Sequence, residues 1–364
     1  MADNWREAGG QTLRYVAIVF VTAALAEGLF ELMLRYPAYV PDSILPALRE
    51  YYYSEDQPFI QYSGDCARYD PQLTYTLKPG SCRFSGREFD TTVTVNSLGV
   101  RDDEKSLHEP QVFVLGDSFA MGWGVKDEET FAALIEKETG IKVLDLAVAS
   151  YGTVREFDIA SRADASRLNT VIVQYFSNDL DENKAYVDNG DHSPVGNEND
   201  YEATRRRHLN SVRYFPGKHV LWLIRRLAGS LLGSANAREN RDEARYFFEV
   251  LFTKLDELSR RAKLAPGSTM VIVAGLTWDV DTSRDVIGKL RPRPNSISQI
   301  FEIGFPVGPG HRYRLDGHWT AAGHREMAEQ IIRIIRDKCN LETEADTSAN
   351  ENKDKECEFF IDEL

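Results

Sequence analysis

The sequence lacks an excess of positive charge. It contains 43 lysines and arginines against 57 aspartates and glutamates, which gives a formal net charge of −14 at pH 7. A field of this sign repels phosphate backbones, and no basic stripe offsets it, so we expect no nucleic-acid partner. Hydrophobic residues make up 42% of the 364 residues, enough for a sizeable core. This content excludes global disorder and a small disulfide-stapled scaffold.

Motifs for cofactors and metals are also missing. No GxGxxG or P-loop pattern opens a helix after a predicted strand, so a cofactor enzyme is not expected. There is no CxxC pair, and the spacings between the four cysteines are too wide for a metal knuckle. We therefore predict neither a cofactor nor a metal site.

Only one long apolar run is present, and a mean hydropathy of −0.39 excludes a polytopic membrane protein. The run covers residues 13–34, and its uninterrupted part, 15–26, is short for a hydrocarbon core that needs about 20 residues. The full run is long enough to span but includes Glu27 and Glu31. We interpret it as a single-pass anchor with these carboxylates near the outer interface.

The charges that flank this run predict its orientation. Arg6 and Arg14 favour a cytoplasmic N-terminus over residues 1–12. The rest of the chain, beyond a signal-anchor helix over 13–34, is then periplasmic, and the protein belongs to the cell membrane. Two alternatives stay open: a cleavable signal peptide, because 24–26 form a small-x-small site, and a buried helix of a soluble protein.

The four cysteines fit an oxidising compartment. Cys66 and Cys82 bracket one polar segment, and Cys339 and Cys357 bracket another. Two local disulfides are the simplest pairing, each contributing about 3 kcal/mol to stability. Residues 339–364 are acidic and largely without periodicity, so we predict a disordered tail that Cys357 pins.

Strands and helices alternate between residues 108 and 338. The predicted strands cover 111–115, 142–148, 170–176 and 269–274, and the predicted helices cover 128–139, 153–168, 241–263 and 321–338. This alternation predicts an α/β domain in which helices cover both faces of a parallel sheet. An N-terminal extension over 35–107, with a strand at 90–95, precedes this domain.

One stretch, 184–240, does not fit the alternation and is predicted to be a helical insertion. It has a polar half and then an apolar segment, 219–232, that carries Arg225 and Arg226. Such a segment suits a lid or a helix on a membrane surface. Its amphipathic spacing also suits an ordinary helix packed on the domain.

Polar residues gather where the predicted strands end. Ser118 follows the first strand, the turn 145–152 follows the second and Asn178 follows the third, while Asp316 and His318 precede the last helix. In an open parallel sheet, ligands bind beyond the carboxyl ends of the strands. We therefore expect these side chains to meet at one edge of the sheet.

This set of residues suits acyl transfer. Ser118 is the candidate nucleophile, His318 the general base and acid, and Asp316 the group that orients the imidazole. The intermediate carries an oxyanion that needs hydrogen-bond donors. The candidates are the Ser118 N–H, the backbone N–H at Ser150 and the side-chain amide of Asn178.

Four short blocks resemble those of the SGNH, or GDSL, hydrolases. The blocks are FVLGDSF (113–119), DLAVASYGTVRE (145–156), FSND (176–179) and DGHWTAAG (316–323). The resemblance covers residues 108–338 and implies a flavodoxin-like, three-layer serine esterase or acyltransferase. We expect Asp117 and Asp179 to give structural support to the site, Asp117 by holding its turn through backbone hydrogen bonds.

Two positions depart from the family pattern. The glycine whose N–H usually binds the oxyanion falls at Ser150, and Gly152 is the fallback if the alignment is shifted by two residues. Only Gly317 separates Asp316 from His318, where the family commonly has two residues. This DxHW form resembles a branch that handles acetyl groups on bacterial exopolysaccharides.

The sequence therefore predicts a membrane-anchored, periplasmic serine esterase that hydrolyses O-acyl esters of a carbohydrate. Among these, O-acetyl esters are the favoured substrates. One alternative is an O-acyltransferase that uses the same acyl-serine and receives its acyl group from a membrane-bound acyltransferase partner. Another is a non-catalytic member of the family that binds polysaccharide.

Overall fold

A computed structural model describes residues 2–193, 195–229, 240–276, 278, 280–290 and 294–339. The chain forms two compact units. Unit 1 comprises Met1–Pro58, Arg207–Ala237 and Arg314–Asp316, and unit 2 comprises Phe59–Arg206, Arg238–Tyr313 and Gly317–Leu364. The predicted extension 35–107 and the predicted insertion 184–240 are each divided between the two units.

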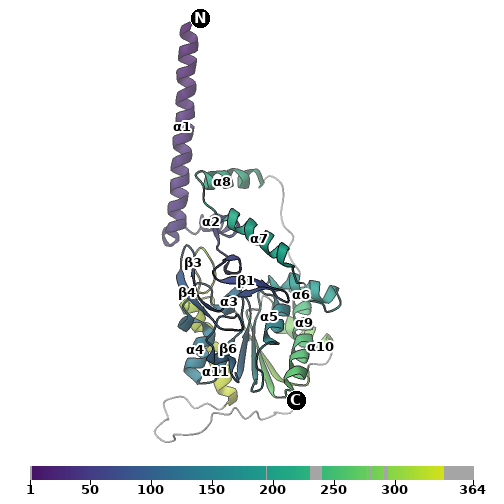
Figure 1. Cartoon of the computed structure of the whole chain (residues 1–364). Coiled ribbons are helices and arrows are strands. Elements are labelled where there is room, and N and C mark those ends of the chain that lie inside the picture. Colours follow the sequence, from purple (N-terminus) through teal and green to yellow (C-terminus); the bar gives the residue numbers. More distant parts are fainter. Residues whose placement is uncertain are drawn as a thin grey trace, which may run out of the picture. The chain divides into compact units, whose positions relative to one another are not determined.

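Unit 2 contains a five-stranded parallel sheet with helices beside it (Figure 1). The order of its strands is β6-β5-β7-β8-β9. Its strands are β5 (Val112–Leu115), β6 (Val143–Asp145), β7 (Thr170–Gln174), β8 (Thr269–Ala274) and β9 (Ile297–Ile303). In chain order the strands lie 2-1-3-4-5, which is the order of flavodoxin-like folds. The predicted α/β class with a parallel sheet is therefore confirmed.

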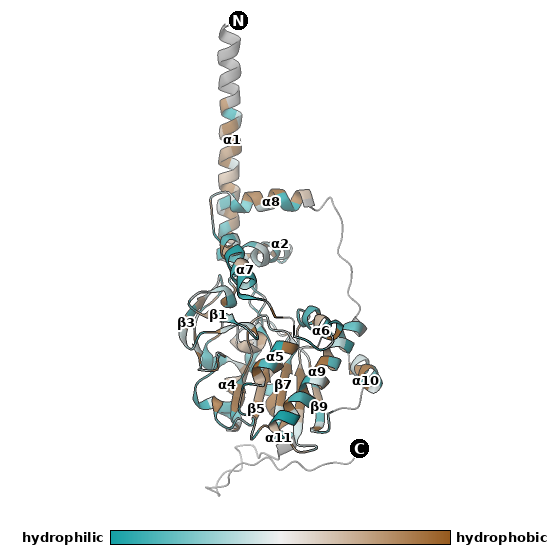
Figure 2. Ribbon diagram, turned by 45° about the vertical axis from the view of Figure 1, so that its right-hand side comes forward, coloured by the Kyte–Doolittle hydropathy of each residue, from teal (hydrophilic) through white to brown (hydrophobic). Residues whose placement is uncertain are grey.

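Helices cover both faces of this sheet. One face carries α4 (Phe131–Thr139) and α11 (Ala321–Cys339), and the other carries α5 (Thr153–Ala160) and α9 (Asn240–Ala262). Val112 and Val114 of β5 pack on the first side, whereas Phe113 and Leu115 pack on the second, because successive side chains of a strand alternate. The central strands are accordingly hydrophobic along their length (Figure 2).

The remaining elements connect or flank these layers. The other helices are α1 (Ala2–Arg35), α2 (Leu45–Tyr51), α3 (Ser118–Met121), α6 (Asp179–Asp188), α7 (Glu198–Ser211), α8 (Lys218–Gly229) and α10 (Val280–Lys289). Single helical turns cover Pro37–Tyr39, Tyr52–Asp56, Ile60–Tyr62, Lys105–Leu107 and Asp127–Glu129. Two hairpins, β1 (Ala67–Asp70) with β2 (Thr74–Leu77) and β3 (Gly80–Ser85) with β4 (Asp90–Val95), precede the sheet.

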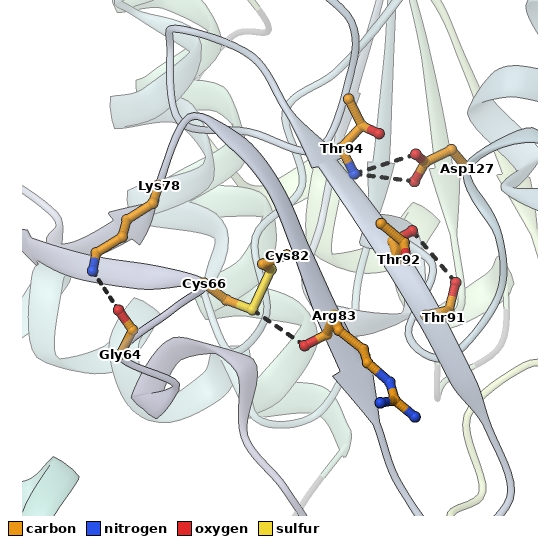
Figure 3. Close-up of a disulfide and its surroundings, with 9 residues drawn as sticks. All are labelled: Gly64, Cys66, Lys78, Cys82, Arg83, Thr91, Thr92, Thr94 and Asp127. Atoms are coloured by element: carbon orange, nitrogen blue, oxygen red, sulfur yellow. Dashed lines mark hydrogen bonds between the residues drawn. A yellow bond between two sulfur atoms is a disulfide. The ribbon is translucent and has the colours of Figure 1, made fainter.

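A disulfide joins Cys66, just before β1, to Cys82 on β3 and so links the two hairpins (Figure 3). The sulfur of Cys66 also lies 3.7 Å from the carbonyl oxygen of Arg83. The second predicted pair includes Cys357, which lies outside the described residues, as does the acidic tail from residue 340 onward.

Several elements differ from the sequence prediction. Strands β1, β2 and β3 and helix α10 were not predicted, and β6 ends at Asp145 instead of residue 148. Strand β9 was not predicted, because its side chains are mostly half-buried at the edge of the sheet and lack a continuous apolar run. Helix α5 ends at Ala160 instead of residue 168, since the chain turns at Ser161 and continues as a loop to β7.

In unit 1, residues 13–35 of α1 are long and apolar enough to cross a membrane, and only 6% of their most apolar stretch is buried. This low burial argues against the core helix of a soluble protein, while an anchor and a signal sequence both fit the length and composition. The end of α1 packs against α2 and α8 through Phe30, Leu34, Leu48 and Trp222.

Candidate active site

Ser118 begins α3 directly after β5, at the carboxyl end of the sheet. Gly116 makes the turn at φ 157°, where a Cβ would lie 2.6 Å from the Cβ of Ala120. Gln174, the last residue of β7, accepts hydrogen bonds from the N–H of Asp117 at 3.2 Å and of Ala120 at 3.1 Å. The neighbouring strand therefore fixes the turn that presents Ser118.

The structure brings Ser118 and His318 together although they are 200 residues apart in the chain, with 2.7 Å between Ser118 Oγ and His318 Nε2. The imidazole stacks on the Trp123 ring, with centroids 4.7 Å apart and planes at 14°, and packs on Phe119 at 4.6 Å. These contacts hold the ring in place. The short distance suits transfer of the hydroxyl proton to the imidazole.

His318 lies in a tight turn. The N–H of Tyr313 donates to the His318 carbonyl at 2.8 Å, and the N–H of Gly317 donates to the Tyr313 carbonyl at 3.0 Å. Gly317 has φ 82°, a conformation that favours glycine. A bridge between Arg312 and Trp319 closes the turn. The single residue between Asp316 and His318 is thus the glycine that this turn requires.

Asp316 belongs to unit 1, where two tyrosines contact it. Tyr52 OH donates to Asp316 Oδ2 at 2.5 Å, and Tyr53 OH donates to the Asp316 main-chain oxygen at 2.6 Å. Both Asp316 and Tyr52 are buried. These tyrosines were not predicted from the sequence, because the run of three tyrosines at 51–53 has no spacing relation to the four blocks.

Ser150 adopts φ 61°, the left-handed region in which glycine is favoured. This is the position at which the family resemblance implies glycine. Gln61 Nε2 donates to Ser150 Oγ at 3.0 Å, and the Arg155 guanidinium donates to the Ser150 carbonyl at 2.7 Å. Across the described part of the chain the Ser150 N–H makes no hydrogen bond, so it is available to a ligand.

Gly152, the fallback donor, is placed differently. Its N–H donates to Glu182 Oε2 at 3.2 Å, and its φ of −99° is open to any residue. Arg155 holds the same carboxylate in an ion pair at 2.6 Å. Of these two N–H groups, that of Gly152 is thus occupied by a carboxylate.

The Asn178 amide lies against two carboxylates. In the amide orientation that lets it donate to both carboxylates, its nitrogen is 3.3 Å from Asp117 Oδ2 and 3.2 Å from Asp179 Oδ1. Asp179 Oδ2 also accepts from Thr153 Oγ1 at 3.2 Å. Asp117 in addition caps α3 by accepting from the Phe119 N–H at 2.9 Å. Asn178 can bind an oxyanion only if one of its N–H groups turns away from these acids.

Three buried acidic residues, Asp117, Asp179 and Glu156, interact electrostatically with one another. Burial raises the pKa of Asp117 to about 6, against the opposing hydrogen bond from the Phe119 N–H. Burial, and then the charge of Asp117, raises the pKa of Asp179 well above its usual range. For Glu156, burial and then the charge of Asp179 do the same. Among the described residues the Glu156 carboxylate has no hydrogen-bond partner, so this cluster favours protonated carboxyls.

Arg101 is buried beside the segment that follows α3. It pairs with Asp127 at 2.8 Å and donates to the carbonyls of Met121 at 3.0 Å and Val125 at 2.7 Å. Arg101 therefore holds the loop 121–125, which contains Trp123. Within the described ranges, no group of three or more histidine, cysteine, aspartate or glutamate side chains is placed to hold a metal ion.

No protein-family model and no curated relative matches this chain. Solved structures match at low identity. One is a carbohydrate esterase whose active site displays divergent catalytic and non-catalytic binding functions, at 11% identity, TM-score 0.37, 63% of this chain and 69% of that one. A family two carbohydrate esterase from Clostridium thermocellum in complex with cellohexaose matches at 12%, TM-score 0.36, 64% and 65%. An acetyl xylan esterase from the rumen bacterium Butyrivibrio proteoclasticus matches at 10%, TM-score 0.34, 64% and 64%.

Glu156→Gln tests the buried acid cluster. The pKa of Glu156 is higher in the folded state than in the unfolded state, so the folded state binds this proton more tightly. The stability that this difference contributes is present at low pH and is lost as the pH rises above the ordinary pKa of 4.5. The variant removes that dependence. We expect its thermal midpoint, relative to the natural chain, to rise steadily from mildly acid to mildly alkaline buffer.

Glu128→Gln, at an exposed position, is the matched control and should show no such trend. A midpoint difference for Glu156→Gln that stays constant with pH would mean that this carboxyl titrates alike in both states.

Proposed function

We propose that this chain is a serine esterase of the SGNH hydrolase family that hydrolyses O-acyl esters of a carbohydrate. The observation that carries the proposal is the 2.7 Å contact between Ser118 Oγ and His318 Nε2 at the carboxyl end of a flavodoxin-ordered sheet. The four sequence blocks that supply these residues support the family assignment.

In the first half-reaction His318 accepts the Ser118 proton while the serine oxygen bonds to the ester carbonyl carbon. The resulting oxyanion is bound by the N–H groups of Ser118 and Ser150 and by Asn178 after its amide turns. Each such donor contributes about 3 kcal/mol to the transition state. The intermediate then breaks its bond to the sugar oxygen, which takes the proton from His318.

In the second half-reaction His318 removes a proton from water, which attacks the acyl carbon. The bond between that carbon and Ser118 Oγ then breaks, Ser118 takes the proton back from His318, and the carboxylic acid is released. We assign Asp316 to the third position of the triad, where a carboxylate keeps the imidazole in the correct tautomer and stabilises the imidazolium. Its burial and its place two residues before His318 support this role.

We further propose an O-acetylated, exported or envelope carbohydrate as the substrate, on the strength of the DGHW segment. Helix α1 serves as a single-pass anchor that leaves both units on the periplasmic side of the cell membrane. The Cys66–Cys82 disulfide supports an oxidising compartment. An O-acyltransferase shares the first half-reaction and differs only in the acceptor.

Ser118→Ala removes the proposed nucleophile. In the full chain held in detergent micelles, we expect hydrolysis of p-nitrophenyl acetate to fall by roughly 10³-fold or more, because the acyl-serine cannot form. The thermal midpoint should stay close to that of the natural chain. Ser81→Ala, at an exposed position on β3, is the control and should keep full activity.

A Ser118→Ala variant that retains most of its activity would disprove the assignment. Mass analysis of the products with an acetylated donor and an unmodified oligosaccharide separates the two reactions: free acetate marks a hydrolase, and an acetylated acceptor marks a transferase.

A further inference from the structure

Among the described residues, one side of helix α8 packs against α1 and α2, which belong to the same unit. Trp222 and Leu223 join the cluster formed with Phe30 of α1. In contrast, Ile224 is 59% exposed and Leu227 is 67% exposed. An amphipathic helix of a soluble domain buries its apolar stripe against the core, so this exposure calls for another apolar environment.

The start of α8 meets the carboxylates that interrupt the apolar run of α1. Glu27 accepts hydrogen bonds from the Val220 N–H and from Tyr214 OH, both at 3.1 Å. His219 Nε2 lies 3.3 Å from Glu31 Oε2. Helix α8 therefore leaves α1 at the level where a spanning helix would pass from hydrocarbon to headgroups.

The direction of α8 fits that level, because it runs crosswise to α1 in both views (Figures 1 and 2). A helix crosswise to a spanning helix lies along the membrane plane. Exposed aromatic side chains occur around the same junction: Tyr36 and Tyr39 follow α1, and Tyr214 and Phe215 precede α8. Aromatic residues are enriched at membrane–water interfaces.

Two exposed arginines, Arg225 and Arg226, lie beside the apolar residues of α8. Arg226 pairs with Glu50 at 2.8 Å, and its guanidinium lies over the Trp222 ring. These two contacts keep the aliphatic part of the Arg226 side chain against the helix. Apolar residues next to arginines are typical of helices that lie in a headgroup layer with anionic lipids.

We propose that α8 is an interfacial helix that inserts Ile224 and Leu227 into the headgroup and acyl boundary of an anionic lipid bilayer. This inference rests on the membrane-anchor part of the proposed function. It assigns the apolar part of the insertion, which contains α8, to membrane contact and not to a lid over the active site.

The test uses the full chain reconstituted in vesicles of phosphatidylcholine with phosphatidylglycerol. The photoreactive residue p-benzoylphenylalanine replaces Leu227 in one variant, Leu25 of α1 in a second and the exposed Val307 of unit 2 in a third. We expect lipid adducts by mass spectrometry at 227 and 25 and none at 307. Arg225→Glu, added to the first variant, should reduce the lipid adducts at 227.

The outcomes separate the two proposals. Adducts at 25 without adducts at 227 overturn the role of α8 and leave the anchor intact. Adducts at 227 alone support α8 and overturn the anchor, and adducts at neither position overturn both. Crosslinks from 227 to protein in place of lipid would show that this face binds a protein.

A different observation concerns the segment that carries Asp316. The chain that follows α1 holds it on several sides: Arg49 Nε donates to the Arg314 carbonyl at 2.8 Å, and Arg314 donates to the carbonyls of Pro37 at 2.9 Å and Val40 at 2.6 Å. The position of Asp316 is therefore set by residues next to the proposed anchor.

Tyr52 acts on the carboxylate itself, since its hydroxyl donates to Oδ2 at 2.5 Å in a buried environment. Such a hydrogen bond favours the ionised carboxylate and fixes its rotamer. We infer that Tyr52 is a positioning residue for the Asp316 carboxylate. This inference rests on the triad of the proposed function.

Tyr52→Phe keeps the ring and removes the hydroxyl. We expect kcat for p-nitrophenyl acetate to fall about tenfold with KM unchanged, as for loss of a charge-assisted hydrogen bond. The acid limb of the kcat/KM profile should move to higher pH, because the more basic carboxylate holds the imidazolium proton more strongly. Tyr53→Phe, whose hydroxyl contacts the main-chain oxygen, should leave this limb in place.

Asp316→Asn separates the two ways in which this inference can fail. If Asp316→Asn loses activity and Tyr52→Phe has the natural pH profile, Tyr52 has no positioning role. If Asp316→Asn keeps its activity, the triad assignment fails and the role of Tyr52 fails with it.

Discussion

The contact between Ser118 Oγ and His318 Nε2 is the interaction on which the proposed reaction depends. A serine hydroxyl is a weak nucleophile unless a base lies within hydrogen-bond distance. The parallel sheet places Ser118 at this distance, because the turn that carries Ser118 lies at the carboxyl edge of the sheet. Gln174 at the end of the neighbouring strand β7 accepts two hydrogen bonds from backbone N–H groups of this turn. Trp123 and Phe119 then fix the plane of the imidazole.

The same region carries features that disfavour stability. Ser150 holds a left-handed conformation that costs a non-glycine residue about 1 kcal/mol, and Glu156 is buried with its pKa raised by that burial. Hydrogen bonds from Gln61 and Arg155 hold the Ser150 turn in spite of this strain. Backbone strain and buried acidic groups with raised pKa values are typical of functional sites.

The sheet and the Ser118–His318 pair could be predicted because both follow from local patterns. Strands buried on both faces are continuously apolar, and chain order places their carboxyl ends on one edge. Strand β9 escaped prediction because an edge strand is half-buried. Tyr52 escaped it because its contact with Asp316 joins residues 264 positions apart, and no spacing rule relates them. The orientation of the Asn178 amide depends on Asp117 and Asp179 packing beside it, which the sequence does not specify.

The most direct test of the proton relay is covalent labelling of the full chain with a fluorophosphonate, followed by peptide mass spectrometry. An activated serine reacts with this probe, and the account predicts one adduct, on Ser118, that forms rapidly in the natural chain. His318→Gln should abolish the adduct while the circular dichroism spectrum is unchanged. An adduct on a different serine, or labelling of Ser118 at the natural rate in His318→Gln, would contradict the account.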